Sequence, residues 1–82
     1  MINITVKLFA SAKDIAGTDD MQISIPENSP AFTVLDELIR HNAQFAKWKD
    51  YLRLAVNCRY VFNDHVLHDN DEVAVIPPVS GG

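Results

Sequence analysis

The sequence has 82 residues, 48% of them hydrophobic, and its seven basic and eleven acidic residues give a formal charge of −4. This length predicts one domain with a small core and little room for a deep pocket of its own, which favours a carrier or interaction module over a self-contained enzyme. The acidic balance and the lack of a Lys/Arg cluster exclude a nucleic-acid-binding protein, which needs cations to displace counterions from phosphates. An acidic surface favours a basic protein partner instead.

Targeting and membrane signals are not found in the sequence. The opening MINITVKLFA contains Lys7 and lacks the apolar segment and cleavage site of a signal peptide. No apolar run approaches the roughly 20 residues that a membrane-spanning helix needs. The single cysteine, Cys58, excludes an internal disulfide. We therefore expect a cytoplasmic protein that contacts no membrane.

Apolar and polar residues alternate in two segments near the start of the chain. Residues 2–9 alternate with period two, which predicts a half-buried strand with Phe9 in its outward register. Residues 21–25 repeat the pattern, so we expect the two strands to pair as a hairpin. Between them, residues 11–17 predict one short helical turn. We expect Ser11 to cap its start and a left-handed Gly17 to end it.

The main helix is predicted at residues 34–43 from an apolar stripe of helical period. Thr33 is placed as its N-cap, and Asp36 lies three residues on, where a carboxylate suits the exposed amides and the helix dipole. Beyond this helix, Phe45 and Trp48 are three residues apart, and we expect both to pack into the core.

The remaining strands are expected to be short, at residues 54–57, 60–62, 66–67 and 72–76. The turn before the last of them contains Asn70, which is well suited to a positive φ. Two strands, a helix and then several strands predict an α+β fold, with a mixed sheet and one main helix packed across it. We place this domain at residues 1–76 and an extended tail at residues 77–82.

The tail carries the most specific functional signal, and it reads Pro77-Pro78-Val79-Ser80-Gly81-Gly82. Two prolines end the strand and hold the chain in an extended path, while two glycines let another protein's backbone approach closely. The useful group is then the carboxylate of Gly82, which ATP can activate as an acyl adenylate and a sulfur donor can convert to a nucleophilic thiocarboxylate. The alternative is that the two glycines are a floppy chain end.

Several segments resemble the sulfur-carrier subunit of molybdopterin synthase, a ubiquitin-like β-grasp family, and they lie at residues 8–10, 13–17, 55–57, 71–74 and 77–82. The terminal block is the closest match. Ile76 stands where many members carry an aromatic residue, and Asn70 replaces the usual glycine of the turn.

The resemblance implies a mechanism in which the chain is not catalytic alone. A ubiquitin-activating-type enzyme would use ATP to adenylate Gly82, and a sulfur donor of the desulfurase or rhodanese type would supply sulfur. The thiocarboxylate would then enter the large synthase subunit and help to build the dithiolene of molybdopterin. A hetero-tetramer of two carriers on a large-subunit dimer is implied, with no cofactor bound by the carrier itself.

Partner contacts are assigned to the tail and to apolar residues beside it. These residues are Phe9, Ile76, Pro77, Pro78, Val79, Ser80 and Gly81. Exposed apolar residues clustered near a functional tail favour a docking patch. For Phe9 the alternative is that the short helix folds over it and makes it part of the core.

Other interpretations stay open or fall short. Cys58, His65 and His68 lack the paired spacing of zinc ligands, so we expect no metal site. A sulfur carrier for thiamine or tRNA thiolation is the neighbouring alternative, and it resembles this chain at the tail. A ubiquitin-like modifier conjugated to lysines, or a plain interaction module, is the alternative of a different class.

Overall fold

The computed structural model describes residues 1–78 of the chain. A five-stranded mixed sheet has the order β2-β1-β5-β3-β4. Strand β5 runs parallel to β1, and the other neighbouring strands are antiparallel. In chain order the elements are β1 (Ile2–Leu8), α1 (Ala10–Ala16), β2 (Asp20–Ile25), α2 (Phe32–His41), the 3-10 segments η1 (Ala43–Lys47) and η2 (Lys49–Tyr51), β3 (Arg53–Val56), β4 (Arg59–Val61) and β5 (Glu72–Ile76).

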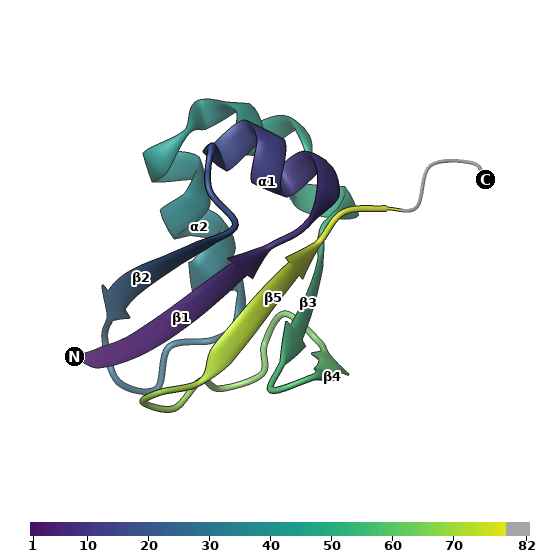
Figure 1. Ribbon diagram of the computed structural model, residues 1–82. Helices are drawn as coiled ribbons and strands as arrows, with labels where there is room; N and C mark the ends of the chain where they lie inside the picture. Colours follow the sequence, from purple (N-terminus) through teal and green to yellow (C-terminus); the bar gives the residue numbers. More distant parts are fainter. Residues whose placement is uncertain (79–82) are drawn as a thin grey trace.

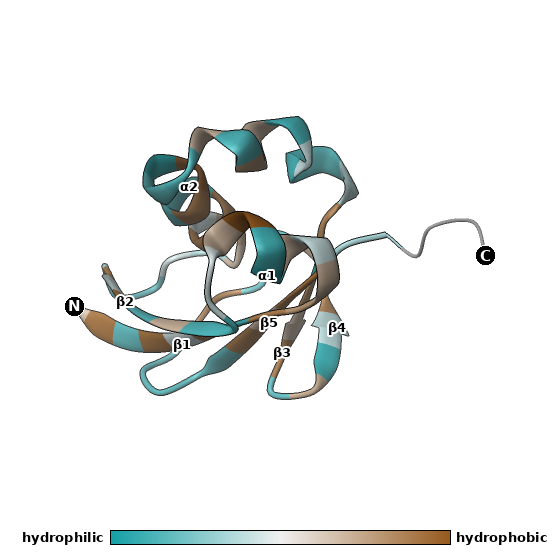
Figure 2. Cartoon of the chain, turned by 45° about the horizontal axis from the view of Figure 1, so that its top comes forward, coloured by the Kyte–Doolittle hydropathy of each residue, from teal (hydrophilic) through white to brown (hydrophobic). Residues whose placement is uncertain are grey.

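One face of the sheet carries the helices and the core (Figure 2). The predicted alternation of β1 is confirmed, since its even-numbered residues are buried and its odd-numbered ones are not. The apolar stripe of α2 packs onto this face through Val34, Leu35 and Leu38, which are all buried. The expected α+β architecture, with one main helix packed across a mixed sheet, is therefore confirmed. None of the helices described is long and apolar enough to cross a membrane.

The predicted N-cap of α2 is wrong. The helix begins at Phe32 rather than at residue 34, and Thr33 lies inside its first turn, where no side-chain cap forms. The first amides are bonded instead by carbonyls of a distant loop, because Phe32 N–H donates to the carbonyl of Asn63 (2.9 Å) and Ala31 N–H donates to that of His65 (2.7 Å). A backbone acceptor from elsewhere in the chain has replaced the side-chain cap.

The first helix follows the prediction at its end and departs from it at its start. Gly17 ends α1 in the left-handed conformation (φ 75°) as expected, and its N–H bonds the carbonyl of Lys13 at 2.9 Å. Ser11 does not cap α1, so that prediction is wrong. The N-cap is Phe9, whose carbonyl accepts from the amides of Ala12 (3.0 Å) and Lys13 (3.3 Å).

Two strand predictions near the C-terminal half need correction. Residues 66–67 form no strand, because Val66 makes only an isolated bridge to Pro30 while Leu67 fills the core. Asn57 lies in a turn rather than in β3, since Asn57 and Cys58 both have positive φ (50° and 73°) between antiparallel strands β3 and β4. This two-residue connection has the backbone twist that suits a hairpin.

A polar cluster locks this hairpin to the start of β5. The Asn57 side chain donates to the carboxylate of Asp71 (2.9 Å) and accepts from the amide of Glu72 (3.0 Å). The carboxylate of Asp71, a residue that is 9% exposed, also accepts from the amide of His68 at 2.8 Å. Asn70, which precedes Asp71, has the expected positive φ of 69°.

We therefore predict that Asn57→Gly lowers the free energy of unfolding by about 1 to 3 kcal/mol, because Asp71 loses a partner while the backbone keeps its positive φ. Asn57→Ala should cost a further 1 to 2 kcal/mol or so, since alanine is strained in the left-handed region. Urea denaturation followed by circular dichroism measures both. Equal stability of the two variants would show that backbone conformation contributes nothing here.

Candidate functional site

The C-terminal segment leaves the sheet beside residues from two other strands. Because β5 is parallel to β1 with Leu8 opposite Val75, both strands end at the same side of the molecule (Figure 1). Strand β3 begins there, with Arg53 opposite Ile76. Leu8 and Val75 face the core, so the residues that follow them, Phe9 and Ile76, adjoin on the outer side.

The structure places Phe9 at the surface. Its side chain is 50% exposed, and its extended backbone (φ −122°, ψ 153°) continues the alternation of β1. The alternative that α1 covers Phe9 and buries it is therefore wrong. We call Phe9 and the half-buried Ile76 the docking surface. Its role in binding a partner stays a prediction.

The two prolines after β5 differ in their surroundings. Pro77 is buried and Pro78 is exposed, so the globular part of the chain holds the first proline in place. The predicted roles of Val79, Ser80, Gly81 and Gly82 lie outside the described residues, and they stay predictions. What the structure describes is the root from which those residues continue.

An apolar groove of about 760 Å³ adjoins this root. We call it the tail-root groove, and the seven residues within 1–78 that line it are Phe9, Ala10, Ser11, Trp48, Ile76, Pro77 and Pro78. None of the seven carries a charge, although the chain as a whole has a formal charge of −4.

Trp48 does not lie where the sequence predicts. Phe45 is buried (1% exposed) as expected, but Trp48 is 39% exposed and forms a wall of the groove. The regular helix ends at His41, and the two 3-10 segments η1 and η2 meet at Trp48, so the helical period does not continue through this residue. Its large side chain is thereby left at the surface.

The strand register adds a residue that the sequence reasoning missed. Ala55 pairs with Ala74 on one side and with Tyr60 on the other, so all three point to the outer face of the sheet. Tyr60 is 66% exposed there. Alternation in β3 and β4 indicates the outward direction of Tyr60, but its neighbours follow only from the strand order.

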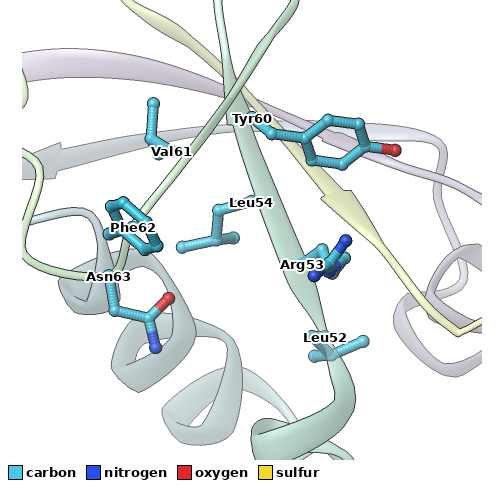
Figure 3. Close-up of a pocket in the computed structure, with 7 residues that line it drawn as sticks. All are labelled: Leu52, Arg53, Leu54, Tyr60, Val61, Phe62 and Asn63. Carbon is cyan, nitrogen blue, oxygen red and sulfur yellow. The ribbon is translucent and has the colours of Figure 1, made fainter.

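Arg53 connects Tyr60 to the docking surface. Its guanidinium lies 5.8 Å from the centre of the Tyr60 ring, which is within range of a cation–π contact. Figure 3 shows Arg53 and Tyr60 on one side of β3, with Leu54 and Val61 on the other. The outer face therefore continues from Ile76 through Arg53 to an exposed aromatic ring.

The residues considered for metal binding do not come together in the described part of the chain. Cys58, His65 and His68 are all exposed. Among residues 1–78, no three His, Cys, Asp or Glu side chains gather in a group that could hold a metal ion. Cys58 occupies the hairpin turn between β3 and β4.

Comparison with known proteins bears on the tail as well as on the fold. The model of the ThiS family matches residues 6–82. The molybdopterin synthase sulfur carrier subunit of Arabidopsis thaliana is 33% identical over 99% of this chain and 84% of its own length. The subunit of the same name from Drosophila ananassae is 38% identical over 100% of this chain and 93% of its own length.

Solved structures give the same fold. A putative molybdopterin converting factor subunit 1 from Pyrococcus furiosus has a TM-score of 0.86 at 31% identity, covering 96% of this chain and 100% of that one. SAMP1 from Haloferax volcanii has a TM-score of 0.85 at 25% identity, covering 98% and 99%. A chain in the complex of subunits 1 and 2 of the Helicobacter pylori molybdopterin-converting factor shares the fold (TM-score 0.67, 20% identity, 99% and 100% covered).

These likenesses confirm the expected ubiquitin-like β-grasp fold, with its mixed sheet and parallel pair of first and last strands. The family match extends from Val6 in β1 to Gly82, and it therefore includes the whole terminal block. This chain belongs to the ThiS family, in which its relatives are the sulfur carrier subunits of molybdopterin synthase.

Proposed function

We propose that this chain is the sulfur carrier subunit of a molybdopterin synthase, and that Gly82 carries the sulfur as a C-terminal thiocarboxylate. The observation that carries the proposal is the geometry of the tail root. Strand β5 lies between β1 and β3 in the sheet, Pro77 is buried at its end, and apolar residues surround the exit. Because the tail starts from a central strand and a buried proline, its position is fixed at the root, which suits delivery of the terminus into another protein's active site.

The chemistry starts with activation of a poor electrophile. In an adenylating partner of the ubiquitin-activating type, the Gly82 carboxylate attacks ATP and releases pyrophosphate, which leaves an acyl adenylate. A persulfide on a sulfur donor of the desulfurase or rhodanese type attacks the carbonyl carbon and displaces AMP. A second thiol on the donor side then cleaves the sulfur–sulfur bond, and the thiocarboxylate is released.

Sulfur transfer takes place in the large synthase subunit. The thiocarboxylate attacks a pterin precursor there, and two carriers supply the two sulfurs of the molybdopterin dithiolene. The partnership is supported by the fold that this chain shares with a chain in the complex of subunits 1 and 2. We further propose a hetero-tetramer of two carriers with two large subunits, acting in the cytoplasm.

The carrier's own residues position the nucleophile. Phe9 and Ile76 place apolar surface next to the tail, so that binding energy from this surface holds the terminus in the partner's site. The carrier binds ATP at no stage, because the nucleotide belongs to the adenylating enzyme. Metal chemistry is likewise assigned to later steps, after the dithiolene exists.

A second candidate function is protein modification, and the likeness to SAMP1 favours it. The same acyl adenylate would then react with a lysine ε-amino group of a target protein and form an amide. The two functions share activation of Gly82 and differ in the attacking atom, which is sulfur in one case and nitrogen in the other.

We predict that the adenylating enzyme, ATP and a persulfide donor raise the intact mass of the carrier by about 16 Da, since sulfur replaces oxygen at the terminal carboxylate. Deletion of Gly82 should abolish this gain while the circular dichroism spectrum stays unchanged. Intact-protein mass spectrometry reads the result. Lysine-linked adducts without the +16 Da species would favour the modifier, and sulfur loading of the truncated chain would refute the mechanism.

The docking surface generates a separate prediction. Phe9→Ala should weaken binding to the large subunit about tenfold or more, because a half-exposed aromatic ring beside the tail is lost from the interface. Phe62→Ala is the matched control, since Phe62 is 86% exposed and lies outside the docking surface and the groove. Isothermal titration calorimetry measures both affinities. If the two variants bind equally well, Phe9 is not part of the interface.

A further inference from the structure

The tail-root groove has walls from three separate parts of the chain. The start of α1 supplies Phe9 and Ala10, the junction of η1 and η2 supplies Trp48, and the exit of β5 supplies the two prolines. Among the described residues of the groove, Trp48 is the large apolar side chain that belongs to neither the docking surface nor the tail. Its exposed side chain therefore extends the apolar surface beyond the residues already assigned to partner binding.

The walls are fixed before any partner arrives. The backbone N–H of Trp48 donates to the carbonyl of Phe45 (3.0 Å), and the Trp48 carbonyl accepts from the amides of Tyr51 (2.8 Å) and Leu52 (3.1 Å). On the opposite wall, the Phe9 carbonyl caps α1. The proline rings fix φ at the third wall. Little backbone freedom is lost when such a groove is filled, which favours binding.

The chemistry of the groove fits a protein segment better than a small molecule. Pockets for small molecules combine apolar walls with a few polar groups that orient the ligand. Among the described residues that line this groove, Ser11 supplies a hydroxyl, Trp48 an indole N–H, and none carries a charge. Tryptophan, by contrast, is the residue type that most often dominates the energy of protein–protein interfaces.

The reach of the tail places the partner over the groove. Gly82 is the fourth residue after Pro78, which lines the groove, and four fully extended residue steps span at most about 14 Å. An active site that reads the terminal carbonyl must therefore lie within this distance of the groove. Its surrounding surface has to cover the groove or leave exposed apolar walls facing water.

From these observations we propose that the tail-root groove receives an apolar segment of the large synthase subunit, with Trp48 as the anchoring residue. This inference rests on the proposed function. The large subunit is favoured over the adenylating enzyme because the carrier must stay bound while its sulfur attacks the precursor, whereas the adenylating enzyme has to release it after loading. A buried tryptophan lengthens residence by slowing dissociation.

The chain's single tryptophan makes a direct test possible. A carrier labelled with 5-fluorotryptophan gives one ¹⁹F resonance, and adding the unlabelled large subunit should shift or broaden it. Unlabelled bovine serum albumin serves as the protein control and should leave the resonance unchanged. Because this measurement uses the unaltered chain, it does not depend on whether a Trp48 variant folds. A resonance that stays unchanged while calorimetry records binding would overturn the inference.

Substitution then measures the contribution of the side chain. Trp48→Ala should weaken binding to the large subunit about tenfold or more, and Tyr51→Ala, an exposed aromatic outside the groove, should not. The rate of sulfur loading at Gly82 should stay within about twofold for both variants. Slower loading of Trp48→Ala with unchanged large-subunit affinity would assign the groove to the adenylating enzyme and overturn the inference. If the unaltered carrier binds no large subunit at all, the proposed function itself fails.

Discussion

The parallel pairing of β1 with β5 is the contact on which the rest of the structure depends. It joins the beginning of the chain to its end and places Leu8 opposite Val75. Both residues face the core, so Phe9 and Ile76 emerge together on the outer side. Together with the antiparallel pairing of β3 and β5, the parallel pairing puts β5 between two strands rather than at an edge, so the tail starts from a strand bonded on both sides. The docking surface and the tail root are adjacent because β1 and β5 pair in this register, and the groove lies beside both.

The sequence predicts most of this architecture where local pattern and backbone preference decide. Period-two alternation predicts β1 and β2, while the special backbone at Gly17 and Asn70 follows from residue type. Prediction from the sequence fails where a hydrogen-bonding group belongs to a distant part of the chain. The start of α2 is fixed by carbonyls of Asn63 and His65, and no local pattern identifies those acceptors. A side-chain cap at Thr33 would have been redundant.

The residues of the candidate site likewise divide into those that the sequence predicts and those that it does not. Phe9 and Ile76 are predictable because alternation gives their direction and the tail gives their neighbourhood. Trp48 and Tyr60 are not, since one depends on where a helix gives way to 3-10 turns and the other on the order of strands. Net charge is also a poor guide at this scale. An acidic chain presents an uncharged groove where its tail begins, so charge complementarity with a basic partner has to act through other parts of the surface.

The position of β5 also bears on how the protein is made. Strand β1 leaves the ribosome first, yet its parallel neighbour is synthesised last among the described strands, and contacts of such long sequence separation form late in folding. Until β5 emerges, the backbone N–H and C=O groups along the facing edges of β1 and β3 have no strand to pair with. A nascent chain interrupted before Glu72 would lack the middle of its sheet, and chaperones or proteases would meet it as an unfolded polypeptide. Such a chain would also lack the tail, so the sheet and the terminus that it presents are completed together.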